Sequence, residues 1–246
     1  MGKVYLAKDE MLERQIALKR IPQEILFDAD ARDDLRQEAN RLLDLAHDNV
    51  VRVHTYYDGP TWPFIAMEYL KGTDLEALLR SGEDILLVEK LELMIQVCRG
   101  LAYAHERGIV HRDIKPENIL LANGHASLAD FGIAQAVCAG CGEDFTVRGV
   151  PIGTPAYMSG EQAIGGDVDC RTDVYSLGCV LFEMLAGRLP YRGQTVEEMF
   201  ALHLTDPIPS VLEYRPDVPK ALDDVVRKAL AKSRRDCFAD ASEFAK

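Results

Sequence analysis

The sequence contains no long hydrophobic run, and this absence is the first constraint on what the protein can be. No apolar stretch approaches the roughly 18 residues of a membrane-spanning helix, and no basic segment followed by an apolar one marks the N-terminus as a secretion signal. Positive charge is also scarce, because 28 Lys and Arg stand against 40 Asp and Glu, a formal net charge of -12. Nucleic-acid binders present basic surfaces instead. We therefore expect a soluble, cytoplasmic protein with neither a membrane segment nor a nucleic-acid partner.

A cysteine framework is the second thing that the sequence lacks. The six cysteines show no spacing typical of a disulfide scaffold, so reduced thiols are expected. One Cys-x-x-Cys pair, Cys138 and Cys141, is typical either of half a zinc site or of a redox pair. No second pair of Cys or His lies nearby to complete about four zinc ligands. Two ordinary loop thiols, or a loop disulfide that responds to oxidation, are the alternatives that stay open.

The first seventy residues alternate short β-like runs with one helix. Val4 to Ala7 and Gln15 to Ile21 are predicted as antiparallel strands joined by a polar turn. Apolar residues at helical spacing predict a helix over Ala29 to Leu45. Asn49 to Tyr57 and Phe64 to Met67 are predicted as two further strands.

After Gly72 the pattern changes to long helices. One apolar face runs from Leu91 to His105 and ends at Gly108, and a buried helix around Val174 to Leu185 ends at Gly187. Two short strands lie between these helices, and two or three helices follow them. We predict an α+β fold of two lobes in a single domain, 1–246: a small, mostly antiparallel β lobe with one large helix (1–70) and a larger, mainly helical lobe (71–246).

The stretch GIVHRDIKPENILL carries the strongest chemical signal. His111, Arg112, Asp113 and Asn118 fit the pattern H-R-D-x-x-x-x-N, and an Asp-Phe-Gly triplet begins at Asp130, seventeen residues after Asp113. Each of these residues alone would be an ordinary loop or turn residue, but their order and spacing together are typical of one family.

On these motifs the chain resembles the eukaryotic-like, bacterial-type serine/threonine protein kinases. The resemblance extends over the whole length. Ile16-Ala17-Leu18-Lys19 is similar to the V-A-I-K strand, Glu38 occupies the place of the glutamate that pairs with its lysine, and residues 172–178 resemble the buried-helix signature of the large lobe. The phrases VYLAKD, GTPAYMSGEQ and DVYSLGCVLFEML look most like the bacterial members.

The resemblance implies a catalytic apparatus for phosphoryl transfer, which depends mainly on positioning and charge stabilisation. Asp113 would accept or orient the proton of the attacking hydroxyl, and Lys115 would neutralise charge on the γ-phosphate. Asn118 and Asp130 would supply the hard oxygen ligands that Mg²⁺ prefers, with Mn²⁺ as an alternative metal. His111 is expected to be structural, packing under Phe131.

The resemblance also implies an ATP site. Lys19 would hold the α- and β-phosphates, and Glu38 would fix its side chain through an ion pair. Val4 and Ala17 would cover the adenine ring, while Met67 would lie at the back of its pocket. The remaining implied contacts are the backbone at Glu68 and Leu70 and the glycine-loop residue Gly2.

Lys115-Pro116-Glu117 follows the serine/threonine pattern of the family, so the expected substrates are proteins with Ser or Thr acceptors. Thr154 matches the threonine that helps to position Asp113 and Lys115. Arg112 is typical of kinases whose activation loop is phosphorylated, and Thr146 is the expected autophosphorylation site, which self-association would serve.

Three departures from the family pattern bear on activity. Gly160 stands where proline is usual, and Cys237 stands where an arginine normally pairs with Glu161, for which a nearby Arg234 or Arg235 is expected to substitute. The glycine-rich phosphate loop is represented only by its last glycine, Gly2, so we expect that its first part and a preceding strand lie upstream of Met1.

Two other functions remain as alternatives. A pseudokinase or scaffold would keep the fold and bind nucleotide with little transfer, although Lys19, Glu38, Asp113, Asn118 and Asp130 are all present. A small-molecule phosphotransferase of related fold is disfavoured, because GTPAYMSGEQ resembles a segment that docks protein substrates.

Overall fold

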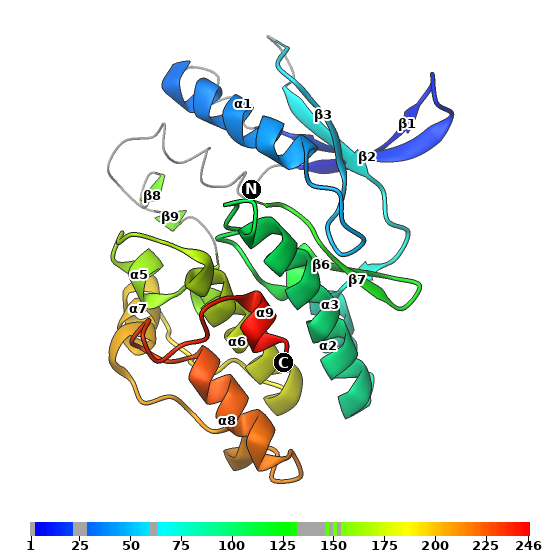
Figure 1. The fold of residues 1–246 in the computed structure, drawn as a ribbon. Coiled ribbons are helices and arrows are strands. Elements are labelled where there is room, and N and C mark those ends of the chain that lie inside the picture. Colours follow the sequence, from blue (N-terminus) through cyan, green and yellow to red (C-terminus); the bar gives the residue numbers. More distant parts are fainter. Residues whose placement is uncertain (1–2, 22–28, 60–62, 132–145, 148–149, 152–153) are drawn as a thin grey trace.

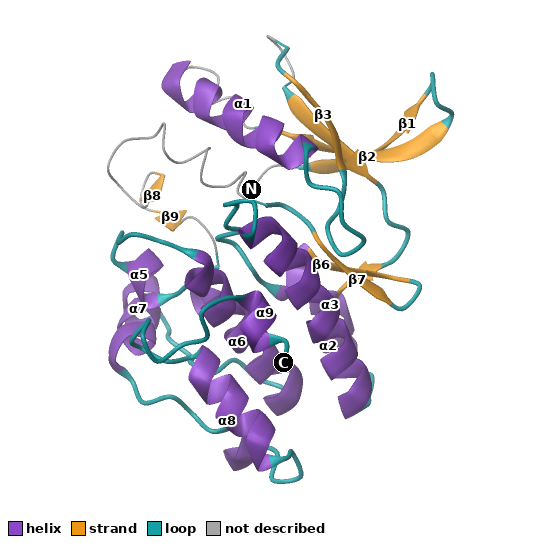
Figure 2. Ribbon diagram, viewed as in Figure 1, coloured by secondary structure: helices purple, strands orange, loops and turns teal. Residues whose placement is uncertain are grey.

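A computed structural model of the chain has an antiparallel sheet with one large helix beside it, and a body of helices lies below both in the view of Figures 1 and 2. It describes residues 3–21, 29–59, 63–131, 146–147, 150–151 and 154–246. None of the helices in these ranges is long and apolar enough to cross a membrane. The predicted two-lobed α+β fold is confirmed.

The small lobe is a four-stranded antiparallel sheet in the order β1-β2-β4-β3, with helix α1 beside it (Figure 1). Its elements are β1 (Val4–Asp9), β2 (Arg14–Arg20), α1 (Ala29–Leu43), β3 (Val53–Tyr57) and β4 (Phe64–Glu68). The carboxylate of Asp9 closes the β1–β2 turn, because it accepts the backbone N–H groups of Met11 and Leu12 at 3.1 Å each. Glu13 completes the turn with a positive φ of 51°.

The larger lobe is mainly helical and carries a small second sheet, β5-β6-β7. Its first elements are β5 (Thr73–Asp74), α2 (Leu75–Ser81), α3 (Leu87–His105), the 3-10 turn Pro116–Asn118, β6 (Ile119–Ala122) and β7 (His125–Leu128). The later ones are β8 (Thr146–Val147), β9 (Val150–Pro151), the 3-10 turn Pro155–Tyr157, α5 (Gly160–Ala163), α6 (Cys170–Ala186), α7 (Val196–Thr205), the 3-10 turn Val211–Glu213, α8 (Lys220–Ala229) and α9 (Ala241–Phe244).

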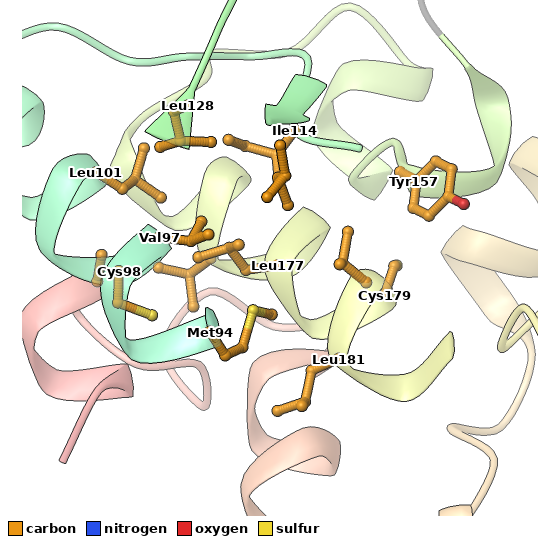
Figure 3. Packing of buried hydrophobic residues seen from close by; sticks show 14 of the residues in the cluster. Met94, Val97, Cys98, Leu101, Ile114, Leu128, Tyr157, Leu177, Cys179 and Leu181 are labelled. Atoms are coloured by element: carbon orange, nitrogen blue, oxygen red, sulfur yellow. The ribbon is translucent and has the colours of Figure 1, made fainter. Parts of the chain in front are cut away.

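Helix α6 forms the centre of this lobe. Of its 17 residues, 13 are buried, as expected of a helix that is apolar on nearly all sides. Figure 3 shows Leu177 of α6 facing Met94 and Val97 of α3 in the shared core. Gly187 ends α6 in the left-handed conformation, with φ of 68°, which confirms the predicted end of this helix.

The segment before β3 differs from the prediction of a continuous strand over 49–57. Asn49 and Val51 exchange backbone hydrogen bonds with Leu128 of β7, at 2.9 and 2.8 Å. These residues therefore join the small lobe to the second sheet, and β3 begins only at Val53. An apolar run looks the same in either pairing, so the sequence alone does not distinguish them.

Gly100 in α3 lies against this joining segment. A Cβ atom at Gly100 would be 2.4 Å from the backbone oxygen of Asn49. That oxygen cannot easily move, because it accepts the N–H of Leu128, and the Asn49 side chain donates to Ala126 O at 2.8 Å.

Overpacking in Gly100→Ala should cost about 1–3 kcal/mol, against a gain of about 1 kcal/mol in helix propensity, so we expect the free energy of unfolding to fall by up to about 2 kcal/mol. Urea unfolding measures this. Gly166→Ala is the control, because its Cβ would meet its nearest atom at an ordinary 3.5 Å. Equal midpoints for the two variants would contradict the close approach at Gly100.

Candidate active site

The carboxylate of Asp173, on α6, holds the backbone of the H-R-D segment. It is fully buried and accepts the N–H of His111 through Oδ2 and the N–H of Arg112 through Oδ1, both at 2.7 Å. His105 of α3 adds a contact from Nε2 to Oδ2 at 2.9 Å. Arg112 has a φ of 66°, which is costly for a non-glycine residue. The two charge-assisted hydrogen bonds from the loop stabilise this conformation.

His111 is structural, as expected. Its side chain is fully buried, and its ring centroid lies 4.4 Å from that of Phe131. Nε2 lies 2.9 Å from the carbonyl oxygen of Ala129, so it donates there, and Nδ1 then accepts the N–H of Asp113 at 3.3 Å. His111 thus connects the H-R-D segment to the Asp-Phe-Gly segment.

Asp113, Lys115 and Asn118 form one cluster. The Asn118 side-chain amide donates to the backbone oxygen of Asp113 at 2.7 Å and to its Oδ2 at 3.0 Å. The Lys115 ammonium lies 3.1 Å from the same Oδ2, and its side chain is only 1% exposed. A buried lysine is uncommon unless it is paired. The fold therefore brings these three predicted residues together.

Lys19 and Asp130 form an ion pair of 2.9 Å between Nζ and Oδ1. Glu38 instead lies 3.3 Å from Arg41, one turn along α1. The predicted Lys19–Glu38 pair is therefore not made in this conformation. Asp130, whose φ is 65°, therefore takes the place beside the Lys19 ammonium that was predicted for Glu38.

Strand register places the predicted adenine-covering residues on one face of the small sheet. Val4 lies opposite Lys19, and Ala17 lies opposite both Leu6 and Met67, so all these side chains point to the same side. Met67 is buried and, with Asp130 and Phe131, lines a small apolar pocket. Glu68 is exposed at the end of β4 and Leu70 is half-buried just beyond it.

Some predicted positions lie outside the described residues or are described in backbone only. Gly2, Cys138, Cys141 and Gly132 of the Asp-Phe-Gly triplet are outside. Thr146 is described as part of strand β8, which pairs with β9, but its side chain is not. Thr154 is half-buried, and its carbonyl accepts the N–H of Tyr157. Its positioning role stays a prediction.

Arg234 pairs with Glu161 in place of the arginine expected at position 237, where this chain has Cys237. Its Nε lies 3.7 Å from Oε1 of Glu161, and Thr172 of α6 donates to the same oxygen at 2.6 Å. The expected substitution is thus confirmed. At Gly160 a Cβ would come within 3.0 Å of the Leu204 side chain of α7, so the small residue makes room for that contact.

A second carboxylate of α6 binds the segment that follows Thr154. Tyr157 donates its hydroxyl to Oε2 of Glu183, on α6, at 2.6 Å. Burial raises the pKa of Glu183, and the hydrogen bond from Tyr157 partly opposes this. Ser176 donates to the carbonyl of Tyr157 at 2.7 Å, so α6 fixes this residue at two points.

A family model described as the protein kinase domain matches residues 1–238. The chain belongs to the protein kinase family. Among curated relatives, the kinase domain is 38% identical over 247 residues to the serine/threonine-protein kinase PknD of Mycobacterium tuberculosis, covering 100% of this chain and 37% of that protein. It is 35% identical over 233 residues to the serine/threonine-protein kinase PrkC of Bacillus subtilis, covering 94% and 36%.

Solved structures agree with this assignment. The Mycobacterium tuberculosis PknI kinase domain superimposes on the kinase domain with a TM-score of 0.78 at 30% identity, covering 100% of this chain and 88% of that one. Rad53 residues 1–466 in complex with AMP-PNP give a TM-score of 0.81 at 22% identity, covering 99% of this chain and 60% of that one. That similarity shows the fold alone. The kinase domain spans little more than a third of the length of the curated relatives above.

Sequence reasoning did not single out Asp173, His105 or Gln162, which all contact the H-R-D segment or its anchor. Asp173 had a signal: it is a charged residue within the otherwise apolar stretch DVYSLGCVLF, where a buried charge requires partners. His105 was placed on the apolar face that runs from Leu91, but nothing in the sequence indicated its polar partner; Gln162 had no signal, because it could equally have faced solvent.

We expect Asp173→Asn to lower the free energy of unfolding by about 2–3 kcal/mol, because an amide retains one acceptor oxygen and turns N–H groups toward the loop donors. Urea unfolding measures the loss. Asp217→Asn is the matched control, since Asp217 pairs with Arg215 on the exposed surface and should matter little. Similar midpoints in the two variants would show that the Asp173 contacts do not stabilise the fold.

Proposed function

We propose that this chain is the catalytic domain of a serine/threonine protein kinase, which transfers the γ-phosphoryl group of ATP to protein hydroxyls. The cluster of Asp113, Lys115 and Asn118, next to the pair Lys19–Asp130, is the observation that carries the proposal. Phosphoryl transfer needs an acceptor for the hydroxyl proton beside cations that stabilise the transferred group, and this cluster supplies both.

Phosphoryl transfer would give each side chain of this cluster, and Lys19, a distinct role. Asp113 takes the proton of the substrate hydroxyl, whose oxygen forms the new bond to the γ-phosphorus as the bond to the β-phosphate oxygen breaks. Lys115, buried beside Asp113, stabilises charge on the γ-phosphoryl oxygens, and Lys19 binds the α- and β-phosphates. Asn118 holds the Asp113 carboxylate in place through its amide N–H.

The donors present fit a Mg²⁺ ion. The side-chain nitrogen of Asn118 donates to Asp113, which leaves the side-chain oxygen of Asn118 available as a ligand. The backbone oxygen of Asn118 accepts the N–H of Ala129, so Asn118 lies close to Asp130, the second proposed ligand. Two hard oxygen donors of this kind are typical of magnesium sites that share the ion with phosphates. When bound, the metal would neutralise charge on the phosphate oxygens; Mn²⁺ would suit the same ligands.

Protein substrates with Ser or Thr acceptors are the proposed class. Lys115-Pro116-Glu117 has the serine/threonine pattern, and the curated relatives named above are serine/threonine-protein kinases. Residues 1–70, with Val4, Ala17, Met67, Glu68 and Leu70, are proposed as the ATP-binding lobe, and 71–246 as the lobe that binds substrate. A cytoplasmic location stays a prediction.

A pseudokinase is the second candidate, and one observation favours it. Lys19 pairs with Asp130 and Glu38 pairs with Arg41, so the predicted Lys19–Glu38 pair that would hold the lysine for phosphate binding is not made. A chain that kept this arrangement would bind nucleotide with little transfer. Measurement of binding and transfer on the same preparation distinguishes the two candidates.

We expect transfer from ATP with Mg²⁺ or Mn²⁺ to Ser and Thr peptides, and a loss of about 10²–10⁴-fold in kcat for Asp113→Asn, the size of a general-base contribution. A peptide panel with Ser, Thr or Tyr acceptors measures this. The matched control is Asp236→Asn, an exposed aspartate in a distant loop. Transfer to Tyr peptides alone would refute Ser and Thr as the acceptors, and ATP binding without transfer would support the pseudokinase.

We also propose that a phosphate on the activation loop, residues 130–154, regulates the site, because the Arg112 side chain has an unused donor. Its Nε is buried and has no hydrogen-bond partner among the described residues. A phosphate adds about -1.5 to -2 charge and accepts several hydrogen bonds from a guanidinium. Thr146 is the proposed acceptor, phosphorylated by a second copy of the chain.

After incubation with ATP and Mg²⁺, mass spectrometry should find phosphate on Thr146 in the wild type and none in Asp113→Asn. Thr146→Val should lower activity toward peptides, and adding Arg112→Ala should cause little further loss, because the two side chains act through one contact. An unmodified segment from Asp130 to Thr154 would refute the proposal.

A further inference from the structure

The side chain of Gln162, in helix α5, joins two segments that are far apart in the sequence. Its Nε2 donates to the backbone carbonyl of Arg112 at 2.7 Å, and its Oε1 accepts the backbone N–H of Ser159 at 3.1 Å. One partner is an acceptor and the other a donor, so only this orientation of the amide satisfies both. Gln162 is half-buried where α5 meets the segment 111–118, which contains the H-R-D residues and is called the catalytic loop below.

The Arg112 carbonyl belongs to the peptide unit that enters Asp113. The preceding peptide unit is fixed by the bond from Arg112 N to Asp173. Gln162 and Asp173 therefore hold the two peptide planes on either side of Arg112, and together they set its positive φ of 66°. The orientation of the peptide between Arg112 and Asp113 determines where the Cα and Cβ atoms of Asp113 lie.

The other end of Gln162 lies on the segment that follows Thr154. Ser159 is fully buried, and its Oγ accepts the N–H of Gln162 at 3.4 Å, so the pair forms a reciprocal cap at the start of α5. Glu161 ties the same short helix to Thr172, the residue before Asp173. The anchor of the catalytic loop and the anchor of α5 are thus neighbours on α6.

We propose that Gln162 is a positioning residue that aligns Asp113 for the transfer step and couples it to the segment of Thr154–Ser159. The proposal rests on the proposed kinase function for its kinetic consequence. Its structural content, that the Gln162 amide fixes the peptide between Arg112 and Asp113, holds whether or not the chain transfers phosphate.

Gln162→Glu is the sharpest variant. A glutamate three residues after a serine keeps the cap, because its carboxylate accepts the N–H of Ser159. It has no N–H to give to the Arg112 carbonyl. Gln162→Met removes the same donor without adding charge. Ser159→Ala is the matched control: it removes the Oγ of the cap, including its long 3.5 Å bond to Gln162 Oε1, but keeps the backbone N–H of Ser159 that orients the Gln162 amide toward Arg112.

Two readouts are expected to move together. Hydrogen exchange at the amides of Arg112 and Asp113 should be faster in Gln162→Glu and Gln162→Met than in the wild type, and unchanged in Ser159→Ala. In a Ser/Thr peptide assay kcat should fall about tenfold in both Gln162 variants, the effect of one lost hydrogen bond in the transition state. The KM for ATP should stay within about twofold of the wild type.

Three results would overturn the inference. Unchanged exchange at Arg112 and Asp113 in both Gln162 variants refutes it whether or not the protein is active. Faster exchange with unchanged kcat refutes the alignment of Asp113, and a loss of kcat in Gln162→Glu alone assigns the effect to added charge. A wild type without transfer, but with faster exchange in the variants, would refute the proposed function and support the coupling.

Discussion

The buried carboxylate of Asp173 is the interaction on which the site depends. It lies on the helix at the centre of the larger lobe and accepts two consecutive N–H groups of the catalytic loop. A carboxylate without donors in this place would be strongly destabilising, and a loop with a positive φ at Arg112 would not keep its shape without an acceptor. Core and loop therefore specify each other.

The other side chains of the site are fixed by contacts that begin at this anchor. His111 contacts Ala129 and Phe131, and Asn118 holds the Asp113 carboxylate. His111 bonds to backbone groups of Ala129 and Asp113, and Asn118 bonds to both the backbone oxygen and the carboxylate of Asp113. The catalytic loop is thus built mainly from side chain to backbone bonds, which fix direction as well as distance.

The nucleotide side of the site is arranged differently, because it depends on an exchange of ion pairs. Lys19 reaches from the small sheet to Asp130 in the larger lobe, while Glu38 pairs within its own helix. The Glu38–Arg41 pair is partly exposed and costs little to break, whereas the Lys19 and Asp130 side chains are only 13% and 24% exposed, so Lys19 is expected to leave Asp130 only for another anion such as a phosphate. Asp113 is therefore held in place by the catalytic loop without nucleotide, whereas Lys19 has to change partners to contact phosphate.

The sequence predicted the fold class and most helices well, because long apolar periodicities such as that of α6 leave few alternatives. The seven-residue α2 was not distinguished, since so short a helix shows little periodicity. The motifs gathered Asp113, Lys115 and Asn118 correctly, because they are close in the chain. The partner of Lys19 could not be predicted, since it depends on where α1 lies in space.

Asp173 fixes the catalytic loop before any nucleotide binds. Hydrogen exchange of the wild type, at the amides of His111 and Arg112, tests it most directly when measured with and without ATP and Mg²⁺. We expect slow exchange at both amides in each condition, because their acceptor, the Asp173 carboxylate, belongs to the core. Exchange as fast as in exposed loops without nucleotide, slowed only when ATP and Mg²⁺ are added, would contradict it.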